Sequence, residues 1–263
     1  MAESHPSTTK VVKRRPTLGD TEKYARLSSI TGITFAVLLV AALVLVHSAP
    51  NLKASEADFT AFYASSNTAL VTVGLYLVPF AGIAFRWHMN TVRLLIRTRT
   101  PSPSAIPDGL QLLAGVLFVA LLFAGTAAAG GVALLKDLGA GPLPSMDVAR
   151  GLLAVGYSMV FVYSVRGAGM YALTTTTLLA NASILPRWLA VLSYLLAAFL
   201  LISTTMNPVV MLLLPAWAVL VGVVTLVRTR HAGQAPPEPD RQAPLEPTPP
   251  STPESTSTGE KPA

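Results

Sequence analysis

Arg166 is the residue whose type and position in this sequence most clearly call for a chemical partner. It lies in Tyr163–Thr177 (YSVRGAGMYALTTTT), inside a long apolar run and about a dozen residues from either end. In a helix that separation is about 18 Å, which is too deep for easy snorkelling. Inserting a central arginine into a bilayer costs at least about 2.5–3.5 kcal/mol, so we expect a group that offsets this cost.

The residues around Arg166 form a stripe at helical spacing. Steps of three and four residues place side chains on one face of a helix, and such steps connect the arginine to a tyrosine, a methionine and two threonines. This stripe is predicted to face the interior of a helix bundle rather than lipid. Its members, the candidate ligand-binding residues, are Tyr163, Arg166, Met170, Thr174 and Thr177, with Ser158 and Met159 as an extension.

The sequence leaves three interpretations of Arg166 open. In the first, the arginine caps freed backbone carbonyls, such as those beside Pro79 or Pro215, and fixes helix packing. In the others, it binds an anionic lipid headgroup or carboxylate, or pairs with an acidic residue of a partner subunit. No Asp or Glu lies inside an apolar segment, so a side-chain partner within the chain must be an amide, a hydroxyl or an acid at a segment end. Besides Thr174, the candidates are Asn67, Asn207, Tyr63 and Asp58.

Most catalytic and cofactor chemistry lacks the residues that it needs. The chain has no Cys, which excludes disulfides, iron–sulfur clusters and thiol nucleophiles. A membrane haem takes axial histidines within the spans, and proton-coupled transport uses acids or histidines there. The four histidines lie at or beyond the segment ends: His5, His47, His88 and His231. We therefore expect no enzyme and no catalytic, cofactor-binding or metal-binding residues.

The elements that must position Arg166 are predicted from composition. Of 263 residues, 52% are hydrophobic and only 12% are charged, about half the charge of a typical soluble domain. Segments of roughly 20 apolar residues are long enough to span a bilayer. The sequence predicts an all-α fold, a polytopic membrane bundle of six transmembrane helices. The predicted spans are 27–46, 68–85, 110–135, 152–179, 188–204 and 208–227.

The segments outside the bundle are predicted to be tails and connections. Residues 1–26 form a basic, disordered tail, 27–228 the six-span domain, and 229–263 a disordered tail rich in Pro, Thr and Ser. Residues 57–66 are expected to form an interfacial helix, and 86–109 a basic, partly extended linker.

Small residues recur four apart in the third predicted span. Gly125 and Ala129 exemplify this spacing. Small side chains let two helix backbones approach closely in lipid, so we expect a close-packing face there.

The basic residues predict the orientation in the membrane. Fifteen of the 19 Lys and Arg fall in the N-terminal tail, the second and fourth connections and the C-terminal tail. By the positive-inside rule, both termini are expected in the cytoplasm. The formal net charge of +6 is explained in the same way, so the lipid bilayer, and not a nucleic acid, is the expected partner.

Two segments resemble stretches of known proteins. Tyr76–Phe85 (YLVPFAGIAF) and Leu185–Tyr194 (LPRWLAVLSY) are similar to segments of uncharacterised bacterial multi-pass membrane proteins common in actinobacteria. The resemblance covers residues 27–227 and implies a six-helix protein of the bacterial cytoplasmic membrane, with no activity or site residues to transfer. We expect a non-enzymatic accessory or scaffold subunit of a membrane complex. The alternative is a small transporter or binder of an anionic or lipidic ligand centred on Arg166.

Overall fold

The computed structural model describes residues 18–46, 49–139, 141–203, 205 and 207–233, and every regular element among them is a helix. The predicted all-α class is therefore confirmed. The elements are α1 (Leu18–Val46), α2 (Glu56–Ala64), α3 (Asn67–Arg99), α4 (Ala105–Asp137), α5 (Met146–Tyr157), the π-helix η1 (Ser158–Ser164), α6 (Val165–Asn181), α7 (Arg187–Ile202) and α8 (Val210–Gly233).

Five helical stretches are long and apolar enough to cross a membrane. They are α1, α3, α4, the continuous run from α5 through η1 to α6, and α8. The apolar helix α7 has only 16 residues, or about 24 Å of helix.

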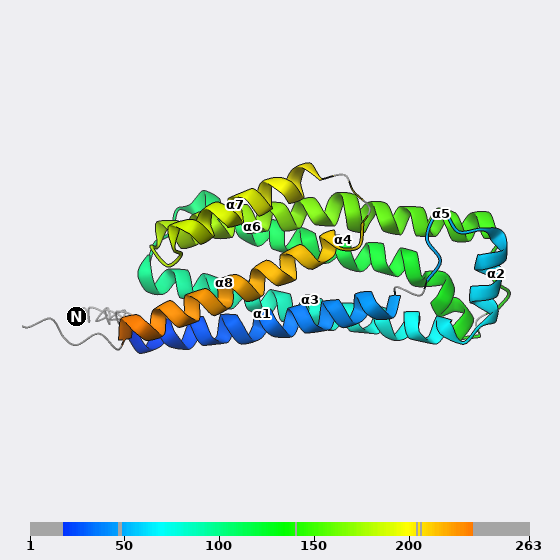
Figure 1. Ribbon diagram of the computed structural model, residues 1–263, viewed down its shortest axis with the longest axis horizontal. Helices are drawn as coiled ribbons and strands as arrows, with labels where there is room; N and C mark the ends of the chain where they lie inside the picture. The colour runs from blue at the N-terminus through cyan, green and yellow to red at the C-terminus, as the bar shows by residue number, and fades with distance from the viewer. Residues whose placement is uncertain (1–17, 47–48, 140, 204, 206, 234–263) are drawn as a thin grey trace, which may run out of the picture. The chain divides into compact units, whose positions relative to one another are not determined.

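The helices pack side by side (Figure 1). Helix α1 contacts α3 and α8, α4 contacts α3 and α6, and α7 lies along α6. The ring of Phe85 is the hub, with its centroid 5.0 Å from those of Phe35 and Phe118 and 4.9 Å from that of Tyr171. These four buried rings join α1, α3, α4 and α6 into one core.

Ionised side chains pair near one end of these helices, which we call the charged end. Asp108 near the start of α4 accepts a hydrogen bond from Arg93 of α3 at 2.5 Å, between Nη2 and Oδ2. Arg228 of α8 donates to the Ile184 carbonyl, just before α7, at 3.2 Å. Arg187 begins α7 nearby in the chain, so α3, α7 and α8 all carry basic residues at this end.

The opposite end, which we call the distal end, is closed by α2 and a polar cluster. Asp137 at the end of α4 accepts hydrogen bonds from Thr68 and Thr72 of α3, at 2.9 and 2.5 Å. The ammonium of Lys136 donates to the Ser65 carbonyl at 2.5 Å. These contacts tie the first turns of α3 to the last turn of α4.

The predicted tail and linker boundaries are wrong in part. Helix α1 begins at Leu18, so residues 18–26 are helical, and α3 continues to Arg99 through most of the expected linker. No proline interrupts either stretch, and Gly19 lies in the first turn of α1. Helix α3 ends only before Pro101, because proline disfavours helix at the preceding residue. Helix α8 likewise extends to Gly233. The rest of both predicted tails lies outside the described residues.

The predicted close-packing face of α4 is confirmed. A Cβ on Gly125 would lie 2.9 Å from the carbonyl oxygen of Gly156 in α5, and a Cβ on Gly156 would lie 2.5 Å from that of Gly125. The same Cβ on Gly156 would also lie 2.7 Å from the Cβ of Ala129. The two backbones thus touch where both residues are glycine.

A short helix is confirmed where residues 57–66 were predicted to be helical. Ser55 caps α2, with its Oγ accepting from the Asp58 amide at 3.1 Å, while the Asp58 carboxylate accepts from the Ser55 amide at 2.9 Å. The side-chain and backbone hydrogen bonds from Ser55 lower the pKa of Asp58 below its usual value.

We expect Ser55→Ala to fray α2, because the helix loses a cap worth about 1 kcal/mol. Hydrogen exchange of the amides in residues 56–60 should accelerate roughly fivefold. In the unsubstituted protein, the Asp58 pKa is lower folded than unfolded. Its stabilising contribution is therefore present above the unfolded pKa and lost as the pH falls through the folded one. Unchanged exchange in the variant would contradict a capping role.

Candidate functional site

The candidate site is a groove of about 450 Å³ on the surface of the bundle, between α4 and the run of η1 and α6. Leu113 and Leu117 of α4 form one wall, while Tyr163, Arg166 and Met170 form the other. All the other lining residues are apolar or glycine. Arg166 is therefore the charged group of an otherwise apolar groove.

Within the part of the chain that the structure describes, the guanidinium of Arg166 is bonded only to its own helical run. Its Nη1 donates to the Val162 carbonyl at 2.5 Å, one turn toward the distal end. Among the described residues, no carboxylate lies within salt-bridge distance of Arg166, and the recorded ion pairs involve other arginines. A guanidinium has five N–H donors, so most of them are free to bind a group in the groove.

The predicted interior orientation of the stripe is wrong at its distal part. Tyr163 is 57% exposed, Arg166 and Met170 are partly buried, and only Thr174 is fully inside. The sequence projection assumed a regular α-helix, whereas residues 158–164 form a π-helix with wider turns. The stripe consequently leaves the interior and reaches the surface at Arg166.

The hydroxyls of the stripe bond locally. Thr174 donates to the Met170 carbonyl at 2.8 Å, and Thr177 to the Leu173 carbonyl at 3.0 Å. The Thr177 hydroxyl also lies 3.1 Å from that of Tyr194 in α7. The structure thus brings Tyr163, Arg166 and Met170 together in the groove, and leaves the two threonines as helix-bonded residues beyond it.

The four predicted partners of Arg166 lie elsewhere. Asp58 is bonded to Ser55, and Asn207 is bonded to the α7–α8 connection. Tyr63 and Asn67 belong to the distal end, beside Lys136. Lys136 lies 15 residues along α4 from Leu121 of the groove, and this separation corresponds to about 22 Å. Arg166 also makes no recorded bond to another helix, so the interpretation that it fixes packing finds no support in its contacts.

The level of Arg166 along the bundle is set by α7. A Cβ on Gly169 of α6 would lie 3.1 Å from both the Leu200 Cβ and the Ala197 carbonyl oxygen. The last turn of α7 therefore packs about one turn from Arg166, and the chain turns back toward α8 at that level. Figure 1 shows α5 and α2 lying well beyond this α7–α8 connection.

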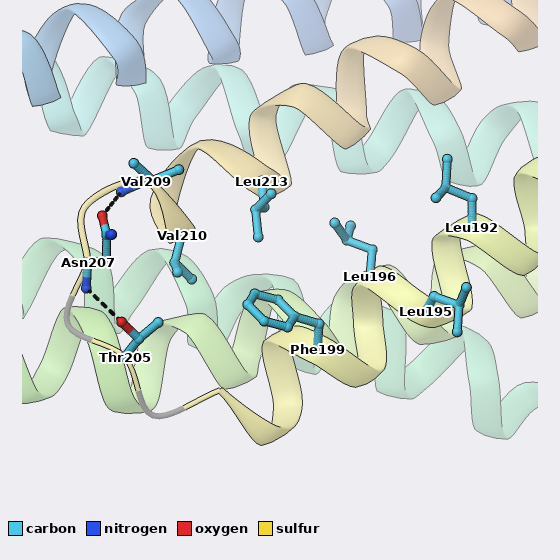
Figure 2. Close-up of a pocket in the computed structure, with 9 residues that line it drawn as sticks. All are labelled: Leu192, Leu195, Leu196, Phe199, Thr205, Asn207, Val209, Val210 and Leu213. Carbon is cyan, nitrogen blue, oxygen red and sulfur yellow. Dashed lines mark hydrogen bonds between the residues drawn. The ribbon is translucent and has the colours of Figure 1, made fainter.

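A second groove, of about 530 Å³, opens between α7 and α8. Figure 2 shows Leu196 and Phe199 of α7 facing Leu213 of α8 across it. At its closed end Asn207 shapes the turn, with its amide donating to the Thr205 hydroxyl at 3.2 Å and its Oδ1 accepting from the Val209 amide at 3.0 Å. The described residues that line this groove are uncharged, and most of them are apolar.

The prediction that His88 lies at a span end is wrong. His88 is 1% exposed within α3, and its Nδ1 lies 2.9 Å from the Ser28 carbonyl oxygen of α1. The span was predicted to end at residue 85, before the first arginine, whereas α3 continues past Arg86 with one buried face and one exposed face.

A buried polar cluster was missed by sequence reasoning. The Nε2 of Gln111 in α4 donates to the Thr175 hydroxyl of α6 at 2.9 Å, and both side chains are 0% exposed. The available signal was a lone amide inside an apolar segment, facing a run of four threonines.

Comparison of the chain with models of protein families, with curated proteins and with solved structures gave no match.

Proposed function

We propose that this chain is a six-span protein of a bacterial cytoplasmic membrane, in which α7 sets the position of the hydrocarbon core. A connection with free backbone groups does not sit in contact with lipid tails, so the α7–α8 connection belongs at a headgroup level. Helix α7 is about 24 Å long. The Arg166 guanidinium lies about one helical turn beyond the end of α7, on the side away from the charged end. The distance from the start of α7 to the guanidinium is therefore close to the 30 Å thickness of a bilayer core.

In this placement the charged end and both termini face the cytoplasm, in accordance with the positive-inside rule. The Arg166 guanidinium then lies near the outer headgroups, so this surface-groove arginine avoids the free-energy cost of a charge in the hydrocarbon core. Arginine binds phosphate in two parallel hydrogen bonds, and a charge-assisted bond is stronger than a neutral one.

The shape of the groove fits the same orientation. From Arg166 it runs toward the charged end past Leu117 and Leu113 to Leu110. Leu121 and Leu110 are 11 residues apart on α4, or about 16 Å, which is roughly the depth of one leaflet. The groove can therefore hold an acyl chain while Arg166 and Tyr163 meet the headgroup. We infer that the protein binds an anionic phospholipid of the outer leaflet, without enzymatic activity.

The distal end supports a second, compatible role as an accessory subunit. Beyond the level of Arg166, α3 exposes Leu70 and Val73 (47% and 50%), and α5 exposes Val148 and Val155 (52% and 48%). In this placement these faces project past the outer headgroups. Exposed apolar faces of this kind mark sites of protein contact, so a partner subunit would cover them.

Purification of the full chain in mild detergent, followed by mass spectrometry of its lipids and proteins, tests the proposal. We expect anionic phospholipid to be enriched over the bulk membrane, and Arg166→Gln to remove the enrichment. A lipid profile identical to that of the bulk membrane would contradict lipid binding. A stoichiometric protein with an acidic intramembrane residue, lost in the same variant, would assign Arg166 to a subunit contact instead.

A further inference from the structure

A layer of polar side chains lies inside the bundle near the charged end. Gln111 and Thr175 are bonded across α4 and α6, and Tyr171 is one turn from Thr175 on the same face of α6. The ring of Tyr171 packs on α4 at Gly115, where an added Cβ would lie 3.3 Å from its Cδ2. Gln111 and Gly115 are likewise one turn apart on α4, so the two faces oppose each other in register.

Two polar atoms of this layer have no hydrogen-bond partner among the described residues. They are the Oε1 of Gln111 and the hydroxyl of Tyr171, and both side chains are 0% exposed. The Thr175 hydroxyl lies near that of Tyr171 but outside hydrogen-bond geometry. Thr175 also differs from Thr174, Thr176 and Thr177, because it has no recorded bond back to its own helix.

The chemistry of these three groups is complementary to one small molecule. The Gln111 Oε1 accepts, the Tyr171 and Thr175 hydroxyls donate or accept, and none of them is charged. Buried water typically makes two to four hydrogen bonds to groups of this kind, whereas a metal cation requires more oxygen ligands. Asp108 lies three residues before Gln111 on α4, toward the charged end, and pairs there with Arg93 of α3.

We propose that Gln111, Tyr171 and Thr175 form a binding site for a water molecule, which links α4 to α6 inside the bundle. The site is separate from the Arg166 groove, because Gln111, Tyr171 and Thr175 are fully buried and none of them lines that groove. Water reaches it from the charged end, where the Arg93–Asp108 pair is only partly buried.

X-ray radiolytic labelling of the full chain in detergent tests the site, since radicals formed from bound water modify adjacent side chains. The controls are Phe35 and Phe118, which are 0% and 1% exposed and pack in the same core. We expect Tyr171 to be modified several-fold faster than either phenylalanine. Modification of Tyr171 at the rate of these controls would overturn the proposal.

The melting temperature of a Tyr171→Phe variant gives a second readout, because the two alternatives change it in opposite directions. If Tyr171 holds a water, Tyr171→Phe removes a hydrogen bond and lowers the melting temperature. If its hydroxyl is unpaired, the same change removes a buried polar group without a partner and raises the melting temperature. The second result would overturn the proposal, and it leaves the Arg166 groove untouched.

Discussion

Gly156→Ala should strongly destabilise the folded protein. The added Cβ would lie 2.5 Å from the Gly125 carbonyl oxygen and 2.7 Å from the Ala129 amide nitrogen, both backbone atoms of α4. Backbone atoms cannot rotate away as a side chain can, so α4 and α5 must separate. Overpacking of this kind costs about 1–3 kcal/mol, and we expect a lower melting temperature in detergent and a smaller folded fraction.

Gly151→Ala is the matched control for this substitution, because it lies on the same helix. Nothing lies within 4 Å of a Cβ added there. Replacing an exposed helical glycine by alanine raises the free energy of unfolding by about 0.5–1 kcal/mol. This variant should therefore be slightly more stable. Equal behaviour of the two variants would mean that α4 and α5 do not meet at Gly125 and Gly156.

Arg166→Gln should abolish stabilisation by anionic phospholipid. A ligand that binds only the folded state raises the melting temperature, and at a given concentration a tighter ligand raises it more. Loss of a hydrogen bond to a charged group costs about 1.5–3 kcal/mol, which corresponds to roughly 10- to 100-fold weaker binding. We expect phosphatidylglycerol to raise the melting temperature of the unsubstituted protein and to leave that of the variant almost unchanged.

Two further variants separate this site from general charge attraction. Arg166→Lys keeps the charge but loses the paired hydrogen bonds, so an intermediate shift is expected. Arg86→Gln removes an exposed arginine of α3 and should leave the shift intact. If Arg166→Gln unfolded the protein in the absence of added lipid, a packing role for the arginine would be supported and the lipid site contradicted.

Much of the fold follows from the sequence, because hydropathy and the signals that start and stop helices depend on short stretches of residues. The apolar runs predict the all-α class, and Val46 is a helix end in both the prediction and the structure. Charged residues mislead where a helix continues past them, as in 86–99. Charge is tolerated on an exposed helix face, so it does not end a helix as proline does.

The candidate site was only partly predictable. The type and apolar surroundings of Arg166 identified it, but its exposure depends on a π-helix and on where α4 packs. Its level in the bundle depends on α7 ending at Ile202. The Gln111–Thr175 hydrogen bond joins two residues that are 64 positions apart in the chain. A single sequence does not show which distant residues pair in this way.

Native mass spectrometry with a lipid titration tests the central claim most directly. The full chain and its Arg166→Gln and Arg86→Gln variants would each be titrated with phosphatidylglycerol or phosphatidylcholine. We predict one tightly retained phosphatidylglycerol on the unsubstituted protein and on Arg86→Gln, with at least about tenfold weaker retention on Arg166→Gln. Equal retention of both lipids by all three proteins would contradict an anionic phospholipid site at Arg166.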